Sequence, residues 1–346
     1  MTPAPASPPP APAKKSSRRL LQIGCGLLAL IGLACGGLLA YFGWQASQQR
    51  AAYEAGHQAY EQGDCQAAQG HFERALSFSG TEEVELLIQK DQRECEAFQP
   101  AVALQEQGSY AAALMAYYEF VDQRPDSPLV AAAQRQSELL FDQVDAYDIV
   151  SLDVCQQLDV LLDAGLIPQP DDHLPGLYYE CGQVFEAEGG YSEALFFYET
   201  FRRDYPDHAL AEDVEAALVR ATIAEAQAAG AGVLPAPQAV ASGGSGPAVV
   251  VIQNDSPEQL SLVFSGPDVR VEELEPCADC VKFQGEGPEF CPEQGPIGRY
   301  TLPAGRYDVV VKSIGDAGVT PFQGAWELNQ GEEYYSCFFL VTSASP

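Results

Sequence analysis

The stretch GGYSEALFFYETFRRDYPDH, from Gly189 to His208, is repeated in outline twice further upstream. The earlier copies are GSYAAALMAYYEFVDQRPDS, which begins at Gly108, and GDCQAAQGHFERALSFSG, which begins at Gly63. Each copy opens with glycine, has an alanine five positions later and an aromatic residue nine positions later. Small and aromatic residues at this helical spacing, between a glycine and a closing proline or, in the first copy, Gly80, predict the second helix of a repeated helical hairpin.

A small residue also precedes each copy by seven positions, at Gly56, Ala101 and Gly182. Such residues let two helices approach closely, so we expect them on the first helix of each hairpin. The whole outline resembles the tetratricopeptide repeat (TPR) family. The endings are similar to those in bacterial cell-envelope TPR proteins, such as the periplasmic coordinator of the Tol–Pal system and outer-membrane assembly lipoproteins. The resemblance implies an all-α TPR-like solenoid over residues 45–229.

The repeats depart from the family in their spacing, because the copies begin 45 and 81 residues apart. Helices expected at about 82–97, 128–146 and 149–163 are therefore degenerate repeats or inserted spacers. A helix over 209–227 is expected to cap the array.

The resemblance also implies a partner-binding groove, because the first helix of each repeat lines the concave face in that family. The corresponding positions are Tyr53, His57, Tyr60, Phe98, Val102, Gln105, Tyr179, Gln183 and Glu186. Aromatic residues with polar neighbours suit the capture of a peptide. Ordinary packing between helices is the alternative interpretation for each of these residues.

Four cysteines in the helical region are placed symmetrically about two turns. Cys65 and Cys95 are equidistant from Gly80, and Cys155 and Cys181 are equidistant from Pro168. An antiparallel hairpin would bring the members of each pair together. We therefore predict two disulfides, each stabilising by about 3–4 kcal/mol for loops of this length. Four unpaired buried thiols are the alternative.

The hydrophobic period changes to two beyond a Gly/Pro/Ser-rich segment at 230–247, which predicts a flexible linker. Short strand-like runs separated by turn residues then predict an all-β antiparallel sandwich over 248–346. Its cysteines could open a zinc site, but no second close pair or histidine completes one. We favour two disulfides with unassigned pairing among Cys277, Cys280, Cys291 and Cys337.

The N-terminus predicts a membrane anchor. A Pro/Ala-rich tail with a basic cluster, residues 1–19, precedes an apolar run at 20–44. The run is long enough for a single-pass transmembrane helix, and the basic cluster places the N-terminus in the cytoplasm. A cleaved signal peptide and a lipoprotein signal fit less well. Small residues at Gly32, Gly36 and Ala40 form a ladder that could pair two such helices into a homodimer.

The net charge of −31 indicates which partners are disfavoured. Beyond residue 49 there are 14 basic side chains against 49 acidic ones. Such a surface repels nucleic-acid phosphates, so we expect no nucleic-acid partner. The sequence contains no recognisable catalytic motif and no metal-ligand or cofactor motif. We therefore expect no enzymatic activity, no cofactor and no metal.

These observations predict a multi-domain protein with a transmembrane helix, a TPR-like solenoid and a β-sandwich. The expected function is a scaffold anchored in the bacterial inner membrane, with its later domains outside the cytoplasm, that binds a protein or peptide partner. The alternative is a ligand-binding or sensory module, in which the sandwich binds a glycan or cation and the helices act as a spacer.

Overall fold

The computed structural model describes residues 17–285, 287–315 and 319–342, without the side chains of 17–32, 34 and 342. Most of the predicted N-terminal tail, residues 1–16, lies outside this description. The chain divides into two compact units. The first comprises residues 1–107 and 119–136, and the second comprises 108–118 and 137–346.

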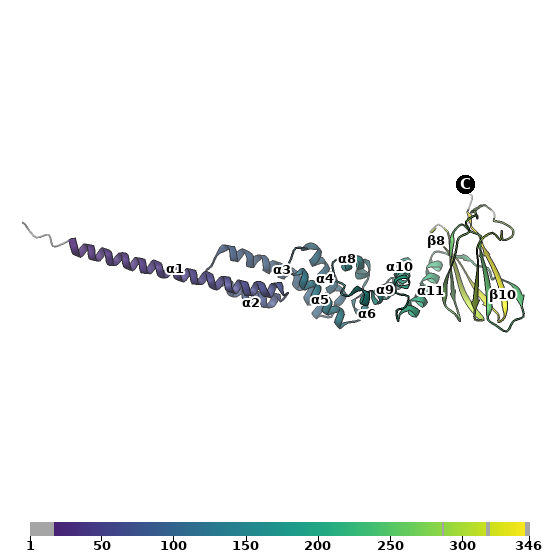
Figure 1. Ribbon diagram of the computed structural model, residues 1–346, viewed down its shortest axis with the longest axis horizontal. Coiled ribbons are helices and arrows are strands. Elements are labelled where there is room, and N and C mark those ends of the chain that lie inside the picture. The colour runs from purple at the N-terminus through teal and green to yellow at the C-terminus, as the bar shows by residue number, and fades with distance from the viewer. Residues whose placement is uncertain (1–16, 286, 316–318, 343–346) are drawn as a thin grey trace, which may run out of the picture. The chain divides into compact units, whose positions relative to one another are not determined.

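The helical part of the chain is built from helices joined by short turns (Figure 1). In chain order they are α1 (Ser17–Glu61), α2 (Cys65–Leu76), α3 (Glu82–Glu106), α4 (Tyr110–Gln123), α5 (Val130–Gln143), α6 (Ala146–Ile149), α7 (Leu152–Gln156), α8 (Leu158–Asp163), α9 (Pro170–Ala187), α10 (Tyr191–Asp204) and α11 (Ala211–Ala228).

The three repeated stretches each follow a tight turn between two helices. The turns join α1 to α2, α3 to α4 and α9 to α10, and they contain Gly63, Gly108 and Gly189. The backbone φ angles there are 82°, 77° and 78°. Glycine adopts this left-handed conformation without steric cost, which explains why each repeat opens with it. The predicted capping helix at 209–227 corresponds to α11.

The region between the first two repeats differs from the prediction. The helix expected at 82–97 and the first helix of repeat two form one continuous helix, α3, which contains Pro100. The turn before it is shaped by Gln49, whose side-chain oxygen accepts a hydrogen bond from the Thr81 N–H at 2.8 Å. A Cβ on Gly80 would lie 1.7 Å from the same oxygen, so a larger residue there would force the Gln49 side chain to move.

The region before repeat three contains several short helices where the sequence predicts one longer helix. The helix expected at 149–163 is interrupted and forms the short helices α7 and α8, and α6 precedes them. Cys155 in α7 is bonded to Cys181 in α9, and Cys65 in α2 is bonded to Cys95 in α3. These are the two pairs that the sequence symmetry predicts.

The C-terminal part of the chain forms a β-sandwich (Figure 1). Its strands are β1 (Gly232–Val233), β2 (Gln238–Ser242), β3 (Ala248–Asn254), β4 (Gln259–Ser265), β5 (Arg270–Leu274), β6 (Phe283–Gln284), β7 (Ile297–Leu302), β8 (Gly305–Ile314), β9 (Phe322–Leu328), β10 (Glu332–Phe338) and β11 (Val341–Thr342).

The sandwich is mixed, whereas the sequence predicts an antiparallel one. One sheet has the order β1-β9-β8-β4-β5, another has the order β2-β10-β3-β7, and β11 pairs with β6. The pairs β1–β9, β3–β10 and β6–β11 are parallel. Strands β1 and β2 come from the segment predicted as a flexible linker, so this segment belongs to the sandwich.

Both faces of the larger sheet are covered. One face packs on the core between the sheets, which contains Phe264, Tyr307 and Trp326. On the opposite face, Val263 of β4 and Val310 of β8 pack against α11 (Figure 1). This second layer of apolar contacts joins the last helix to the sandwich within one compact unit.

The predicted membrane span is wrong. The apolar run at 20–44 lies within α1, and its large side chains that the structure describes, from Leu33 to Trp44, are exposed. Among the described residues, no helix combines the length and the apolar character that crossing a bilayer requires. This finding overturns the single-pass transmembrane helix in the predicted fold, the membrane anchor and the inner-membrane location. The dimer contact at Gly32, Gly36 and Ala40 stays a prediction.

Candidate functional site

The predicted groove residues of the first repeat are used for contacts between α1 and α3. His57 Nδ1 lies 2.7 Å from Asp91 Oδ2, and the Tyr60 hydroxyl donates to Glu94. Tyr60 is only 1% exposed. Glu94 also accepts from Ser127, so one carboxylate joins α1, α3 and the turn after α4. A peptide could not reach Tyr60 without opening this packing.

Burial shapes the electrostatics of these contacts. It raises the pKa of the Tyr53 phenol to about 12, with a further contribution from the Asp91 carboxylate. Burial also raises the pKa of Asp91, although the hydrogen bond from His57 partly opposes this. Since these polar groups hydrogen-bond to one another between α1 and α3, this cluster serves packing between helices.

The predicted groove residues of α3 are also buried or half-buried. Phe98 is fully buried, and its ring centroid lies 5.3 Å from that of Phe120. Phe98 and Val102 line a cavity of about 400 Å³ beside the turn at Gly63. The Gln105 amide donates to the Gln136 carbonyl at 3.5 Å.

In the third repeat, Glu186 connects three helices. Its carboxylate accepts two hydrogen bonds from Arg220 of α11, at 2.6 and 2.9 Å, and one from the Tyr198 hydroxyl of α10 at 3.1 Å. Tyr179 packs near Tyr198, and Gln183 is half-buried. Six of the nine predicted groove residues lie in the first compact unit and three in the second. A groove that uses all nine stays a prediction.

A more accessible site lies one residue away from the predicted positions on α9. Here residues of α7, α8, α9 and α10 line an open cavity of about 510 Å³. Its aromatic wall consists of Tyr178, Phe185, Phe196 and Phe197. We call it the aromatic pocket. Its volume is within the range of ligand-binding pockets in proteins.

Helical spacing and ring contacts shape the aromatic wall. Tyr178 and Phe185 are seven residues apart and therefore share one face of α9. The Phe197 ring stacks on Phe185 with centroids 5.6 Å apart and lies 6.1 Å from Tyr178. Phe196 meets the edge of Phe197 at 5.5 Å but is 61% exposed. The pocket thus has a packed base and one ring that projects into solvent.

The Cys155–Cys181 disulfide holds one side of the pocket in place. Cys155 is a lining residue, and its bond to Cys181 connects α7 to the middle of α9. Leu158, which follows in α8, is buried against the same space. Because this wall is covalently fixed, a ligand would not have to order it on binding.

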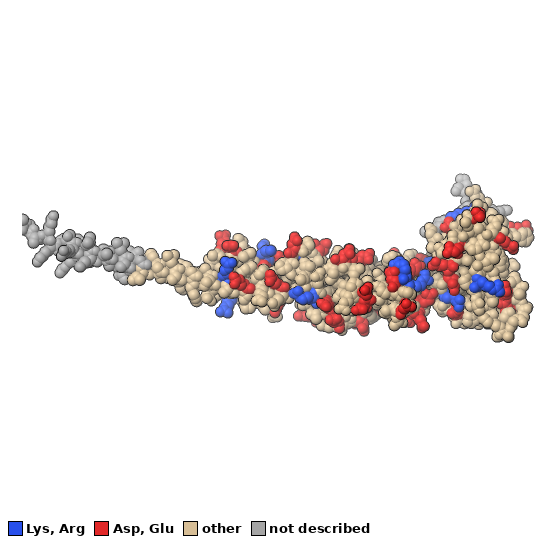
Figure 2. All heavy atoms as spheres, viewed as in Figure 1, with Lys and Arg blue, Asp and Glu red and all other residues tan. Residues whose placement is uncertain are grey.

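Carboxylates complete the rim of the aromatic pocket. Asp159 and Glu193 line it, and both are exposed. Burial raises the pKa of the Tyr178 phenol, and Tyr205 and the carboxylates of Asp159 and Asp204 raise it further. Within the residues that the structure describes, neither Asp159 nor Glu193 forms an ion pair with a basic side chain. In Figure 2, acidic side chains gather over the part of the chain that Figure 1 labels α8.

A larger cavity of about 860 Å³ lies where α10 and α11 meet the sheet, but its charges are largely paired internally. Glu225 accepts from Ser192 at 2.8 Å and pairs with Lys312 at 3.3 Å. Arg202 lies 3.7 Å from Glu273. These contacts connect the helices to the sheet, so a charged ligand would have to displace them.

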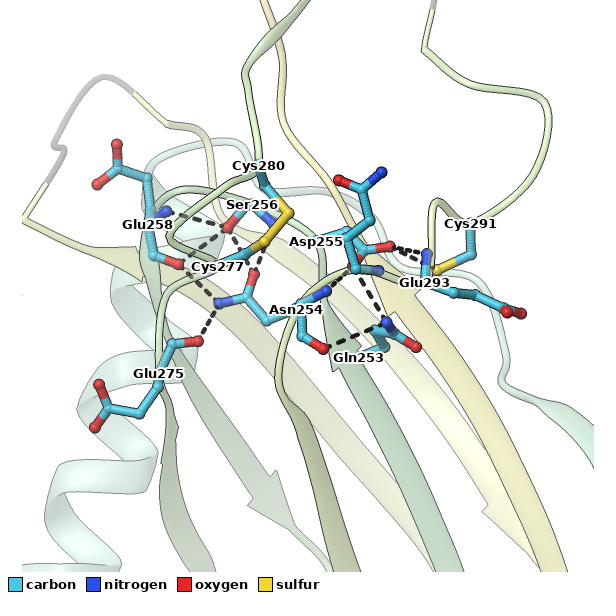
Figure 3. Close-up of a disulfide and its surroundings, with 12 residues drawn as sticks. Gln253, Asn254, Asp255, Ser256, Glu258, Glu275, Cys277, Cys280, Cys291 and Glu293 are labelled. Atoms are coloured by element: carbon cyan, nitrogen blue, oxygen red, sulfur yellow. Dashed lines mark hydrogen bonds between the residues drawn. A yellow bond between two sulfur atoms is a disulfide. The ribbon is translucent and has the colours of Figure 1, made fainter.

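The four cysteines of the sandwich form disulfides and do not form a metal site. The structure bonds Cys277 to Cys280, as Figure 3 shows, and Cys291 to Cys337, so the four sulfur atoms are not zinc thiolates. Only Cys291–Cys337 ties the long loop to the last long strand, β10. The Cys277–Cys280 bond joins two residues that are only three positions apart.

Asp255 holds the same loop and is fully buried. Its carboxylate accepts hydrogen bonds from the backbone N–H groups of Glu293, Gln294 and Gly295, at 2.7, 2.9 and 2.6 Å (Figure 3). Asp255 approaches the Cys291 and Cys337 sulfurs, but these are bonded to each other. Its oxygens are therefore engaged by backbone donors, which argues against a cation bound at Asp255.

Sequence reasoning missed the aromatic pocket because it followed the family pattern to Tyr179. The available signal was the pair FF at 196–197 in an otherwise amphipathic helix, where one of two adjacent aromatic residues must face outward. No protein-family model matches this chain, and the curated proteins contain no significant match to it. The resemblance to tetratricopeptide repeats therefore stays a prediction from the repeat pattern in the sequence.

Proposed function

We propose that this chain is a non-enzymatic scaffold whose TPR-like hairpins bind a peptide segment of a partner protein. The aromatic pocket of the third hairpin is the binding site. The observation that carries the proposal is the Phe196 ring, which is 61% exposed beside a cavity of about 510 Å³ with an otherwise buried aromatic base. Covering a ring of this size is worth about 2 kcal/mol, and aromatic residues commonly dominate binding energies.

The surroundings of the pocket favour a peptide over a small molecule. Its mouth is formed by exposed residues of α8 and α10, so a ligand can extend beyond the cavity along the helix surface. The fixed wall at Cys155 and the stacked base reduce the ordering cost that otherwise weakens peptide binding.

Selection of displayed random peptides on the full chain tests this function. We expect the selected peptides to bind the Phe196→Ala variant about tenfold or more weakly, because their anchor loses its aromatic contact. Tyr147→Ala is the matched control, since Tyr147 is also exposed, at 74%, but does not line the pocket. Equal binding of the selected peptides to wild type and to Phe196→Ala would contradict the proposal.

A further inference from the structure

We infer that the aromatic pocket selects a cationic side chain of its peptide ligand, with arginine preferred over lysine. This inference rests on the proposed function and specifies the chemistry of that site. It follows from the combination of aromatic faces and unpaired carboxylates around one cavity.

The aromatic wall supplies the first part of the argument. The rings of Tyr178, Phe196 and Phe197 border the same space. The face of an aromatic ring carries partial negative charge and attracts a cation placed over it. A planar guanidinium can also stack on such a ring, which an ammonium group cannot do. A wall of several rings therefore suits an arginine side chain.

The rim supplies the second part. Asp159 of α8 and Glu193 of α10 approach the pocket from two different helices. Neither forms an ion pair within the described residues, so both are available to a ligand cation. The nearby Arg203 is already engaged, because its guanidinium makes two hydrogen bonds to Asp204, at 2.8 and 2.9 Å. The described lining of the pocket thus contains two carboxylates and no basic side chain.

The contrast with the larger cavity supports this assignment. There, Lys312 and Arg202 already lie close to Glu225 and Glu273. In the aromatic pocket the corresponding cations are missing from the described lining. The net charge of −31 adds a long-range attraction for basic segments and would speed their association.

The test uses four synthetic peptides of sequence Gly-Ser-X-Ser-Gly, where X is arginine, lysine, citrulline or glutamate. Citrulline has nearly the shape of arginine but no charge. The difference in affinity between the arginine and citrulline peptides therefore measures the contribution of the positive charge. Binding to the full chain is measured by calorimetry at low salt. We expect arginine to bind about tenfold more tightly than citrulline, with lysine between them and glutamate weakest.

Two variants assign the effect to the pocket. Asp159→Asn combined with Glu193→Gln should remove most of the preference for arginine over citrulline. The matched control is Asp153→Asn combined with Glu188→Gln, which changes the net charge equally at exposed positions outside the pocket lining. The control should preserve the preference. Phe196→Ala should weaken the binding of all four peptides.

The outcomes separate this inference from the proposed function. Equal affinities for arginine and citrulline, or an arginine preference that survives Asp159→Asn with Glu193→Gln, would overturn the inference. If displayed peptides that need Phe196 lack basic residues, the proposed function stands and the inference fails. If selected peptides bind without any need for Phe196, the proposed function fails and the inference fails with it.

Discussion

The ring of Phe72 in α2 lies against Gly56 in α1, so closely that a Cβ added to Gly56 would come within 2.6 Å of it. Gly182 and Tyr198 have the same relationship in the third hairpin, at 2.2 Å. In these two repeats the aromatic residue thus packs on the small residue of its own hairpin.

Gly56→Ala should therefore destabilise the first hairpin by about 1–3 kcal/mol, because the buried Phe72 ring has to move. Gly70→Ala in α2 is the control, since a Cβ there meets nothing within 4 Å. It should be neutral or stabilise by up to about 1 kcal/mol through helix propensity. Urea unfolding followed by circular dichroism compares the two variants. Equal stabilities would show that the close approach is not needed.

Glu186→Gln should cost about 1 kcal/mol of unfolding free energy. The substitution removes the charge from a side chain that is 17% exposed and that binds both Arg220 and Tyr198. Glu333→Gln is the comparison, because the Arg299–Glu333 pair is more exposed, at 59% and 33%. Exposed pairs contribute little, so its cost should be smaller. The reverse order in thermal unfolding would refute this assignment of roles.

Asp91→Asn should change how stability depends on pH. Because the folded protein raises the pKa of Asp91, the folded state holds this proton more tightly than the unfolded state. The resulting stabilisation is full below about pH 4, the unfolded pKa, and is lost as the pH rises through the raised folded pKa. Above the raised folded pKa of Asp91, the buried carboxylate therefore contributes less to stability than its protonated form does at low pH.

We accordingly expect Asp91→Asn to gain stability over wild type between about pH 4 and pH 7, and the gain to disappear below about pH 4. Unfolding in urea at a series of pH values measures the difference. Glu96→Gln, at an exposed position on the same helix, should show no such trend. A gain for Asp91→Asn that is constant across pH would rule out the titration of Asp91 as its cause.

The two types of disulfide should differ in their effect on stability. Cys65–Cys95 closes a loop of 30 residues, whereas Cys277–Cys280 spans only three. Loop-closure entropy predicts that replacing both cysteines by serine costs about 3–4 kcal/mol for the first bond and about half of that for the second. Thermal melting of the two double variants tests this order. A larger loss at Cys277–Cys280 would mean that chain entropy does not govern these bonds.

Much of the local structure was predictable, because it depends on neighbours in the chain. Gly63, Gly108 and Gly189 mark turns since the backbone there is left-handed. The apolar runs at 248–254 and 259–265 lie between turn residues, and they form β3 and β4. Periodicity reports which side of an element is buried, and this information is contained in the sequence.

The candidate site could not be predicted in the same way. The pattern placed binding residues at Tyr60 and Tyr179, but packing buries Tyr60 and leaves Phe196 exposed. Periodicity indicates that one face of a helix is covered, but it does not say which neighbour covers it. That depends on how α8, α9 and α10 approach one another.

The sequence by itself determined the helical hairpins, the strands and the pairing of Cys65 with Cys95 and of Cys155 with Cys181, because these follow from spacing along the chain. Only the tertiary structure decided that α11 packs on the sheet, that the segment predicted as a linker adds β1 and β2, and that Phe196 stands open beside Asp159. The physical reason is that such contacts join residues far apart in sequence. Their free energies depend on surface complementarity, which no local pattern encodes.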